Sequence, residues 1–227
     1  MKSLIKVTIA LLVVVTGIAN AAVVVTNDVS GDTYISNYHP DTNYGADNLL
    51  IVAAPGTGAG GDYRSLLSFN LPLIPNAVIT SATLSLVNWN FGGNGVPMTQ
   101  SIYTATSAWN EDTATWTNAN GNYNPADLNV SSTIFTPTNN FVTYNFDVTA
   151  IVNSWYTNTT ANNGFYILSE YTPGASFASY AASDLGYASP GLTINYSVVS
   201  EVPEPSTAAL IVASGALLLV LRKRRGV

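Results

Sequence analysis

The sequence predicts an all-β domain, a jelly-roll-like antiparallel β-sandwich of two sheets with one short helix. Three observations favour this fold. Apolar and polar residues alternate with a period of two in several short segments, Gly and Pro clusters separate those segments, and Thr, Val and Tyr are abundant. About ten such segments in a chain of 227 residues are typical of two packed sheets.

Two segments alternate most clearly. The residues that would face the core in them are Val142, Tyr144, Phe146, Val148, Leu192, Ile194, Tyr196 and Val198. Further strands are expected at residues 23–26, 33–36, 49–53, 63–70, 83–89, 101–106, 165–169 and 176–181. Turn-forming residues at 55–61, 72–75 and 92–97 separate several of these strands. Period two with one apolar face indicates strands that pack on a core from one side.

One segment has helical spacing instead. After position 147, apolar residues recur at i, i+3, i+4 and i+7, and they are Val148, Ile151, Val152 and Trp155. This spacing places them on one face of a short helix, with Asp147 or Thr149 as its N-cap. We expect this helix to cap an open end of the sandwich.

The N-terminus has the three parts of a secretory signal peptide. Lys2 and Lys6 are followed by an apolar run at residues 7–18, and Ala19-Asn20-Ala21 forms a cleavage site of the A-x-A type. A buried core helix is the alternative, but the run has no polar face. We therefore expect a signal helix at residues 1–21 that is cut after Ala21.

Residues 201–227 also have three parts. Pro203-Glu204-Pro205 precedes an apolar stretch at 207–221, and a basic tail follows at 222–225. The stretch is shorter than the ~20 residues of a usual membrane helix, but the basic tail favours a cytoplasmic C-terminus with the rest of the chain outside.

This order of parts resembles the PEP-CTERM sorting signal. The resemblance implies export through the inner membrane of a Gram-negative cell and transient anchoring in the membrane by the C-terminal helix. An exosortase-type enzyme would then remove the tail near Pro203, Glu204 and Pro205. The protein would remain in the cell envelope or the extracellular matrix, in association with exopolysaccharide.

The region between these two ends is acidic. Arg64 is its only basic residue against 12 Asp and Glu residues between Ala22 and Val202, so the region has a net charge of about −11. Nucleic-acid binding needs several cations to neutralise phosphates, so this class of partner is excluded. With no cysteine and only His39 as histidine, a disulfide framework and Cys-rich or multi-His metal centres are excluded as well.

Four motifs occur in order between residues 28 and 197. They are Asn43-Tyr44-Gly45 before a Leu-rich strand, RSLLSFNL at 64–71 leading into ITSATLSL at 79–86, WNEDTATW at 109–116 before FDVT at 146–149, and PGLTINY at 190–196. Together they resemble the DNRLRE domain, which is related to the jelly-roll carbohydrate-binding module family 96. The resemblance covers roughly residues 28–197 and predicts a domain at residues 22–200. It implies a non-catalytic module that binds polysaccharide, with alginate as the best known ligand.

The charge of the chain argues against alginate. A polyuronate usually pairs with Lys or Arg, and an acidic domain with one Arg repels it unless calcium bridges the two. We therefore expect a neutral glycan or none. Exposed aromatic rings can stack on sugar faces, and Trp89, Tyr38 and Tyr44 are the candidates for such a role. Trp116 and Trp155 are expected in the core instead.

Two further residue groups have alternative interpretations. Asp41, Asn43 and Asp47 place side-chain oxygens at alternate positions around a Gly turn, which is the spacing of calcium loops and also of ordinary turns. No cofactor is required, and a structural calcium ion is the one cofactor that this spacing suggests. Arg64 could hold a sugar carboxylate, but we expect it to form a structural ion pair with a carboxylate of the protein, such as that of Asp147 or Glu111.

The sequence gives little support for catalysis. Glu111 and Asp112 are adjacent and would face opposite ways on a strand, whereas a glycosidase needs two carboxyl groups ~5–9 Å apart across a bond. No nucleophile-elbow or P-loop pattern is present in the sequence. We expect a secreted, non-catalytic polysaccharide-binding protein. The alternatives are a structural matrix or surface protein without glycan specificity and, less favoured, a glycan-cleaving enzyme.

Overall fold

The computed structural model describes residues 22–56, 60–89, 96–127, 131–135, 141–174, 177–186 and 189–198. Residues Ala22–Val198 form one compact unit. The predicted signal peptide (1–21) and sorting segment (201–227) lie outside the described residues. Among the helices that are described, none has the length and hydropathy needed to cross a membrane.

Strands dominate the described part of the chain. They are β1 (Ala22–Ser36), β2 (Leu49–Val52), β3 (Tyr63–Phe69), β4 (Ala77–Val87), β5 (Met98–Thr104), β6 (Ser131–Phe135), β7 (Thr143–Asp147), β8 (Phe165–Ser169), β9 (Ala178–Ala181) and β10 (Gly191–Val198). The helices are α1 (Trp116–Ala119), α2 (Thr149–Tyr156) and the 3₁₀ helix η1 (Ser183–Leu185). The predicted all-β sandwich with a short helix is confirmed.

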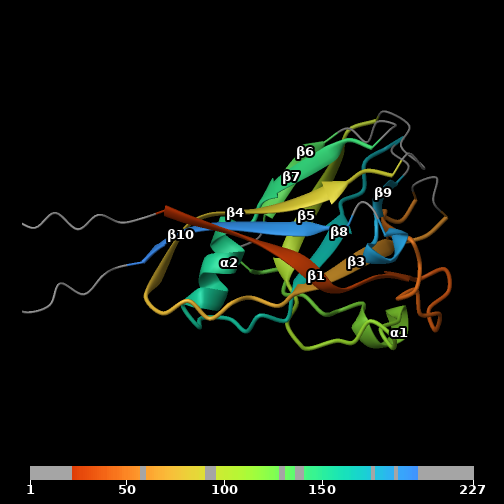
Figure 1. Ribbon diagram of the computed structural model, residues 1–227. Helices are drawn as coiled ribbons and strands as arrows, with labels where there is room; N and C mark the ends of the chain where they lie inside the picture. The colour runs from red at the N-terminus through yellow and green to blue at the C-terminus, as the bar shows by residue number, and fades with distance from the viewer. Residues whose placement is uncertain are drawn as a thin grey trace, which may run out of the picture. The chain divides into compact units, whose positions relative to one another are not determined.

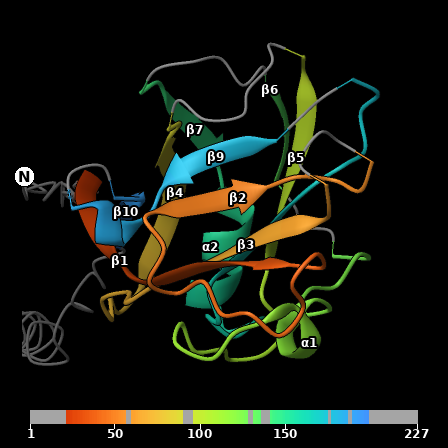
Figure 2. The ribbon, with the colours of Figure 1, turned by 90° about the vertical axis from the view of Figure 1, so that its right-hand side faces the viewer.

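One antiparallel sheet has the order β6-β5-β8-β3-β1-β10-β4-β7, and β2 and β9 form a small second sheet. Strand β1 joins the two halves of the large sheet, because its first part pairs with β10 and its second part pairs with β3 (Figure 1). The register shifts between Val29 and Gly31, where β1 passes from one partner to the other. Figure 2 shows β2 and β9 as a separate pair.

The main hydrophobic core lies between these layers. Leu84, Phe146 and Ile194 point into it from β4, β7 and β10, and all three are buried. Helix α2 packs against β4, and its buried Trp155 contacts the ring of Phe165 in β8 at 4.8 Å between centroids. The helix therefore covers the core between the two halves of the sheet.

Most predicted elements are present, with some differences. The segments expected at 23–26 and 33–36 belong to one continuous strand, β1, because the polar residues between them include the bulge where the strand changes partner. Strand β6 was not predicted. Among the described strands it pairs only with β5, and Ile134 on it is 73% exposed, so no apolar face marks it in the sequence. The short helices α1 and η1 were not predicted either.

The outer face of β3 and β8 is also covered. Ile35, Leu66 and Tyr166 form a second, smaller core cluster there with Ala114 and Ala119. Because β3 has a core on each side, the adjacent residues Leu66 and Leu67 are both fully buried. The segment that covers this face, residues 105–127 with helix α1, carries the candidate site.

Candidate functional site

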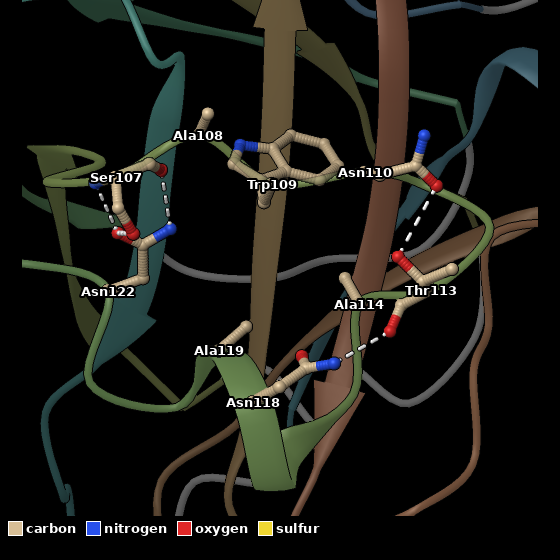
Figure 3. Close-up of a pocket in the computed structure, with 9 residues that line it drawn as sticks. All are labelled: Ser107, Ala108, Trp109, Asn110, Thr113, Ala114, Asn118, Ala119 and Asn122. Atoms are coloured by element: carbon tan, nitrogen blue, oxygen red, sulfur yellow. Dashed lines mark hydrogen bonds between the residues drawn. The ribbon is translucent and has the colours of Figure 1, made fainter.

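A pocket of about 460 Å³ lies between Trp109 and helix α1 (Figure 3). It is lined by Ser107, Ala108, Trp109, Asn110, Thr113, Ala114, Asn118, Ala119 and Asn122. Figure 3 shows the Trp109 ring on one side of the pocket and Asn118 and Ala119 on the other. The indole Nε1 of Trp109 donates a 2.9 Å hydrogen bond to the carbonyl of Asn163, which fixes the orientation of the ring. None of these nine lining side chains is charged.

Side-chain amides hold the wall of the pocket in place. Asn122 accepts at Oδ1 from the backbone N–H of Ser107 (2.7 Å) and donates from Nδ2 to the Ser107 carbonyl (2.9 Å). Asn118 donates from Nδ2 to the carbonyl of Thr113 (2.8 Å). Asn110 accepts at Oδ1 from the N–H of Asp112 (3.0 Å), and its exposed Nδ2 donates to none of the described residues. Asn110 therefore offers a donor to a ligand.

Two smaller hollows lie along the same segment of the chain. One of about 200 Å³ shares Ser107, Asn118 and Asn122 with the Trp109 pocket. The other has a volume of about 270 Å³. It shares Thr106 with the hollow of about 200 Å³ and extends to Thr160. Asp127 is the one charged residue that lines either of them. The three hollows form an extended surface of hydroxyl and amide groups along one side of segment 105–127.

The predicted calcium segment positions this surface. Asn43 donates from Nδ2 to the carbonyls of Glu111 (2.6 Å) and Ala114 (2.9 Å). Asp41 accepts from the hydroxyl of Thr117 in α1 (2.6 Å). The third residue of the set, Asp47, accepts from the Tyr34 hydroxyl (3.1 Å). Each of the three thus has its own hydrogen-bond partner, and calcium at Asp41, Asn43 and Asp47 stays a prediction.

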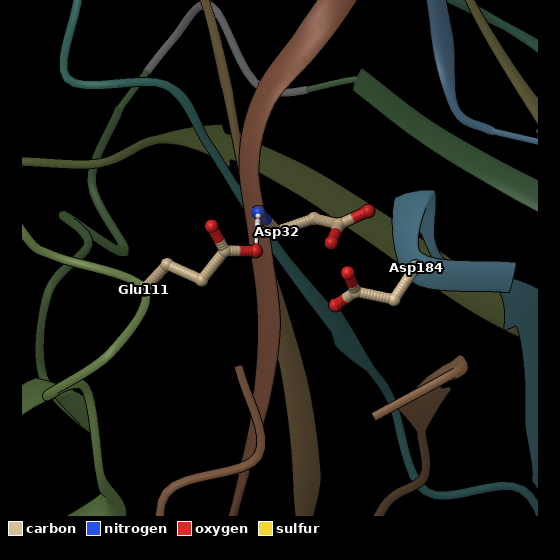
Figure 4. A group of neighbouring side chains, drawn as sticks. All are labelled: Asp32, Glu111 and Asp184. Atoms are coloured by element: carbon tan, nitrogen blue, oxygen red, sulfur yellow. Dashed lines mark hydrogen bonds between the residues drawn. The ribbon is translucent and has the colours of Figure 1, made fainter. Parts of the chain in front are cut away.

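A separate group of three acidic side chains includes one residue of segment 105–127. Asp32 from β1, Glu111 and Asp184 from η1 place carboxylate oxygens within 4.8 Å of one another (Figure 4). Glu111 accepts from the backbone N–H of Asp32 (2.9 Å), and Asp32 accepts from the N–H (2.8 Å) and hydroxyl (3.0 Å) of Ser183. No motif in the sequence indicates this group, because its members come from three distant segments.

Burial raises the pKa of Asp32 to about 6, and the negative charges of Glu111 and Asp184 act in the same direction. Asp32 is only 1% exposed, so its charge is poorly solvated. Carboxylate oxygens are the ligands that hard divalent cations prefer, and protonation of Asp32 relieves the same repulsion without a cation.

Arg64 has a different ionic partner from those expected. It pairs with Asp62, with 2.7 Å between Nη2 and Oδ2, and it donates from Nη1 to the Asn120 carbonyl (2.5 Å). The structural ion pair expected for Arg64 is therefore present, but its partner is Asp62, directly before β3, rather than Asp147 or Glu111. The guanidinium also lies 4.7 Å from the ring centroid of Trp116. Arg64 therefore ties α1 to β3, and its side chain is only 17% exposed.

The three predicted ligand-binding aromatics do not line the pocket at Trp109. Tyr44 stacks on the Tyr34 ring at 4.1 Å. Tyr38 is 63% exposed and contacts the His39 ring edge-on. Trp89 contacts the exposed ring of Phe141 at 4.7 Å. Trp109 was missed as a candidate, although its place in a loop rich in Ser, Asn and Thr is a signal that sequence analysis could have used.

A comparison with curated proteins finds no match. The family model of carbohydrate-binding module family 96 matches residues 23–196, which include almost all of the sandwich and segment 105–127. Such modules bind carbohydrate, which is compatible with a role other than catalysis. On this match, the chain belongs to carbohydrate-binding module family 96.

Proposed function

We propose that this protein is an exported, non-catalytic module that binds a neutral polysaccharide in the pocket beside Trp109. The observation that carries the proposal is the lining of this pocket, which combines one large aromatic ring with uncharged hydroxyl and amide groups. An indole ring can stack on the apolar face of a sugar, and amides and hydroxyls can bond its hydroxyl groups. Family membership supports carbohydrate as the ligand.

The charge of the domain favours an uncharged glycan as the ligand. Arg64 is the only cation between residues 22 and 198, and it is engaged by Asp62 and the Asn120 carbonyl. A polyuronate would bring further negative charge to an acidic domain and would find no cation in the pocket lining. A neutral glycan meets no such repulsion.

The two ends of the sequence support export. The signal peptide predicted at residues 1–21 would bring the chain through the inner membrane, and the PEP-CTERM-like segment at 201–227 would hold it there until processing by an exosortase-type enzyme. The domain would then associate with exopolysaccharide in the cell envelope or matrix.

Affinity electrophoresis of residues 22–198 tests the proposal. This segment contains both core clusters and forms one compact unit. We expect neutral polysaccharides in the gel to retard it, equally with calcium or with EDTA. Trp109→Ala should weaken this binding about tenfold, equivalent to ~1.4 kcal/mol. Tyr171→Ala, which removes a ring that is 60% exposed and outside these hollows, is the matched control and should bind normally.

Other outcomes would contradict the proposal in different ways. Retardation by alginate alone, and only with calcium, would show that the ligand class is wrong. The absence of retardation by any polysaccharide would favour a structural matrix protein. New reducing ends in the polysaccharide would reveal a glycan-cleaving enzyme.

A further inference from the structure

A strip of mostly uncharged side chains, with Asp147 at one end, runs along the outer face of β4 and β7. In this pair of strands Val87 lies opposite Thr143, Ser85 opposite Asn145 and Thr83 opposite Asp147. The alternate residues Leu84, Leu86 and Phe146 are buried in the core. Because successive side chains of a strand point to opposite faces, the first set faces away from the core.

The strip begins at a pair of aromatic rings. Trp89 and Phe141 continue the pairing past Val87 and Thr143, since the N–H of Asn88 donates to the carbonyl of Val142 (2.8 Å). Their rings meet edge to face, with 4.7 Å between centroids, and Phe141 is 55% exposed. The exposed ring of Phe141, packed against the partly buried ring of Trp89, offers an apolar surface for stacking at the end of a polar strip.

The backbone at Phe141 supports a functional role for this pair. Its φ of 54° lies in the left-handed region, which a bulky residue rarely adopts and which costs about 1–3 kcal/mol. Such strain occurs preferentially at functional sites. Here it accompanies a Phe ring that is more than half exposed and that packs on Trp89 rather than in the core.

We propose that this strip is a second binding surface, for an extended neutral polysaccharide chain. One sugar would stack on Trp89 and Phe141, and the following ones would bond to the groups on Ser85, Asn145 and Thr143. Ser85 donates to Oδ1 of Asn145 (2.8 Å), so the exposed Nδ2 of Asn145 stays available to a ligand. From Trp89 to Thr83 the strip is about 20 Å long, which suits a linear chain of several sugars.

The chemistry of the strip favours a glycan over a protein partner. The centre of a protein interface is mainly apolar, and each partner usually buries ~800 Å². Here the apolar part is limited to one end, and hydroxyl and amide groups make up most of the rest. Asp147, at the far end, is the one charged residue among the strand pairs of the strip, and no cation accompanies it. A polyanion is therefore disfavoured here too.

The strip and the Trp109 pocket lie on different sides of the domain. In both ribbon views α1 is at the bottom and β7 is near the top (Figure 1, Figure 2). The domain would thus be bivalent and able to cross-link two glycan chains, or to bind one long chain with increased avidity. This inference rests on the proposed function, because it assumes that the domain binds neutral glycan.

Two measurements on the same variants test the inference: gel retardation by a neutral polysaccharide that retards the wild-type domain, and agglutination of beads coated with it. We expect Trp89→Ala and Trp109→Ala each to weaken retardation about tenfold and to abolish agglutination, and the double variant to lose both. Trp89→Phe, which keeps a ring, should agglutinate. Asn145→Asp, an exposed change that adds a charge to the strip, should weaken retardation without affecting the thermal midpoint.

The outcomes separate the two proposals. If Trp89→Ala and Asn145→Asp behave like wild type while Trp109→Ala loses all binding, the second surface is wrong and the Trp109 pocket stands. If Trp109→Ala behaves like wild type while Trp89→Ala loses binding, the strip stands and the pocket is wrong. If no neutral polysaccharide retards the wild-type domain, both are wrong.

Discussion

The side-chain amide of Asn43 donates a 2.6 Å hydrogen bond to the main-chain carbonyl of Glu111, 68 residues further along the chain. The second proton of the same amide bonds to the carbonyl of Ala114. These two bonds hold both sides of the turn that follows Trp109. A loop near the start of the domain therefore determines the shape of the pocket that we propose for the glycan.

Asn43→Asp replaces the donating amide with an acceptor. The carboxylate would face the two carbonyl oxygens of Glu111 and Ala114 without a proton to share, so we expect unfolding to become easier by about 1–3 kcal/mol. Glycan binding at Trp109 should weaken with it. Chemical denaturation and affinity electrophoresis measure the two effects.

Asn124→Asp is the control for this change. Asn124 is exposed and bonds through Oδ1 to the N–H of Ala126, an interaction that Asp can make as well. We expect its stability to match that of wild type within about 0.5 kcal/mol. Equal stabilities for Asn43→Asp and Asn124→Asp would show that the Asn43 bonds do not hold the loop.

Arg64→Met should be among the most damaging single substitutions. It would leave Asp62, whose side chain is 10% exposed, without a counter-charge, and it would remove the bond to the Asn120 carbonyl. Loss of one partner from a largely buried ion pair costs about 3–5 kcal/mol. Denaturant unfolding of the isolated domain gives this difference.

Neutralising both members of the pair separates the charge from the packing. In Asp62→Asn with Arg64→Met no unpaired carboxylate remains, so part of the lost stability should return. Arg64→Lys keeps the charge but not the planar group that lies against the Trp116 ring, so it should fall between wild type and Arg64→Met. A double variant less stable than Arg64→Met would contradict this account.

The acidic group around Asp32 predicts an unusual pH dependence. Burial raises the pKa of Asp32 from its ordinary value of 3.8 to about 6, so the folded state binds a proton more tightly than the unfolded state. This proton stabilises the folded state fully below about pH 4, and the stabilisation is lost as the pH rises through about 6. The contribution amounts to about 2–3 kcal/mol.

Asp32→Asn should remove this dependence of the unfolding free energy on pH. The Asn side chain can still form hydrogen bonds to Ser183. Unfolding free energies measured in EDTA between about pH 4 and about pH 7 would show the loss of this dependence. EDTA matters because a divalent cation among Asp32, Glu111 and Asp184 would also neutralise the repulsion. If wild type and Asp32→Asn have the same pH profile, Asp32 does not bind the proton.

The strands and the longer helix could be predicted because each has one buried face. In β10, buried and partly exposed residues alternate over almost the whole strand, and in α2 the residues Ile151, Val152 and Trp155 are buried at helical spacing. Strand β6 lacks such a face, since Ile134 points to solvent. Local periodicity therefore found elements that pack on the core and missed one at an edge.

The site was harder to predict because long-range contacts build it. The alternation of oxygen side chains from Asp41 to Asp47 suggested a cation, which stays a prediction, but it gave no sign that Asn43 bonds to carbonyls in a distant loop. The partner of Arg64 was a neighbour in sequence that the search for distant acids passed over. Net charge can be counted without knowing any contact, and it predicted a neutral ligand. The uncharged lining of the Trp109 pocket supports that prediction.

Gly45→Ala tests the contact between the loop that contains Asn43 and the main chain of Glu111. A Cβ atom at Gly45 would overlap the main-chain carbonyl of Glu111, and Gly45 is not among the residues with positive φ, so lack of space rather than backbone conformation explains the glycine. We expect a loss of about 1–3 kcal/mol and weaker glycan binding, because the turn after Trp109 must move. Gly191→Ala meets no atom within 4 Å and should cost much less in denaturant unfolding. Similar losses for the two variants would mean that the close approach of Gly45 to Glu111 has no particular role in stability.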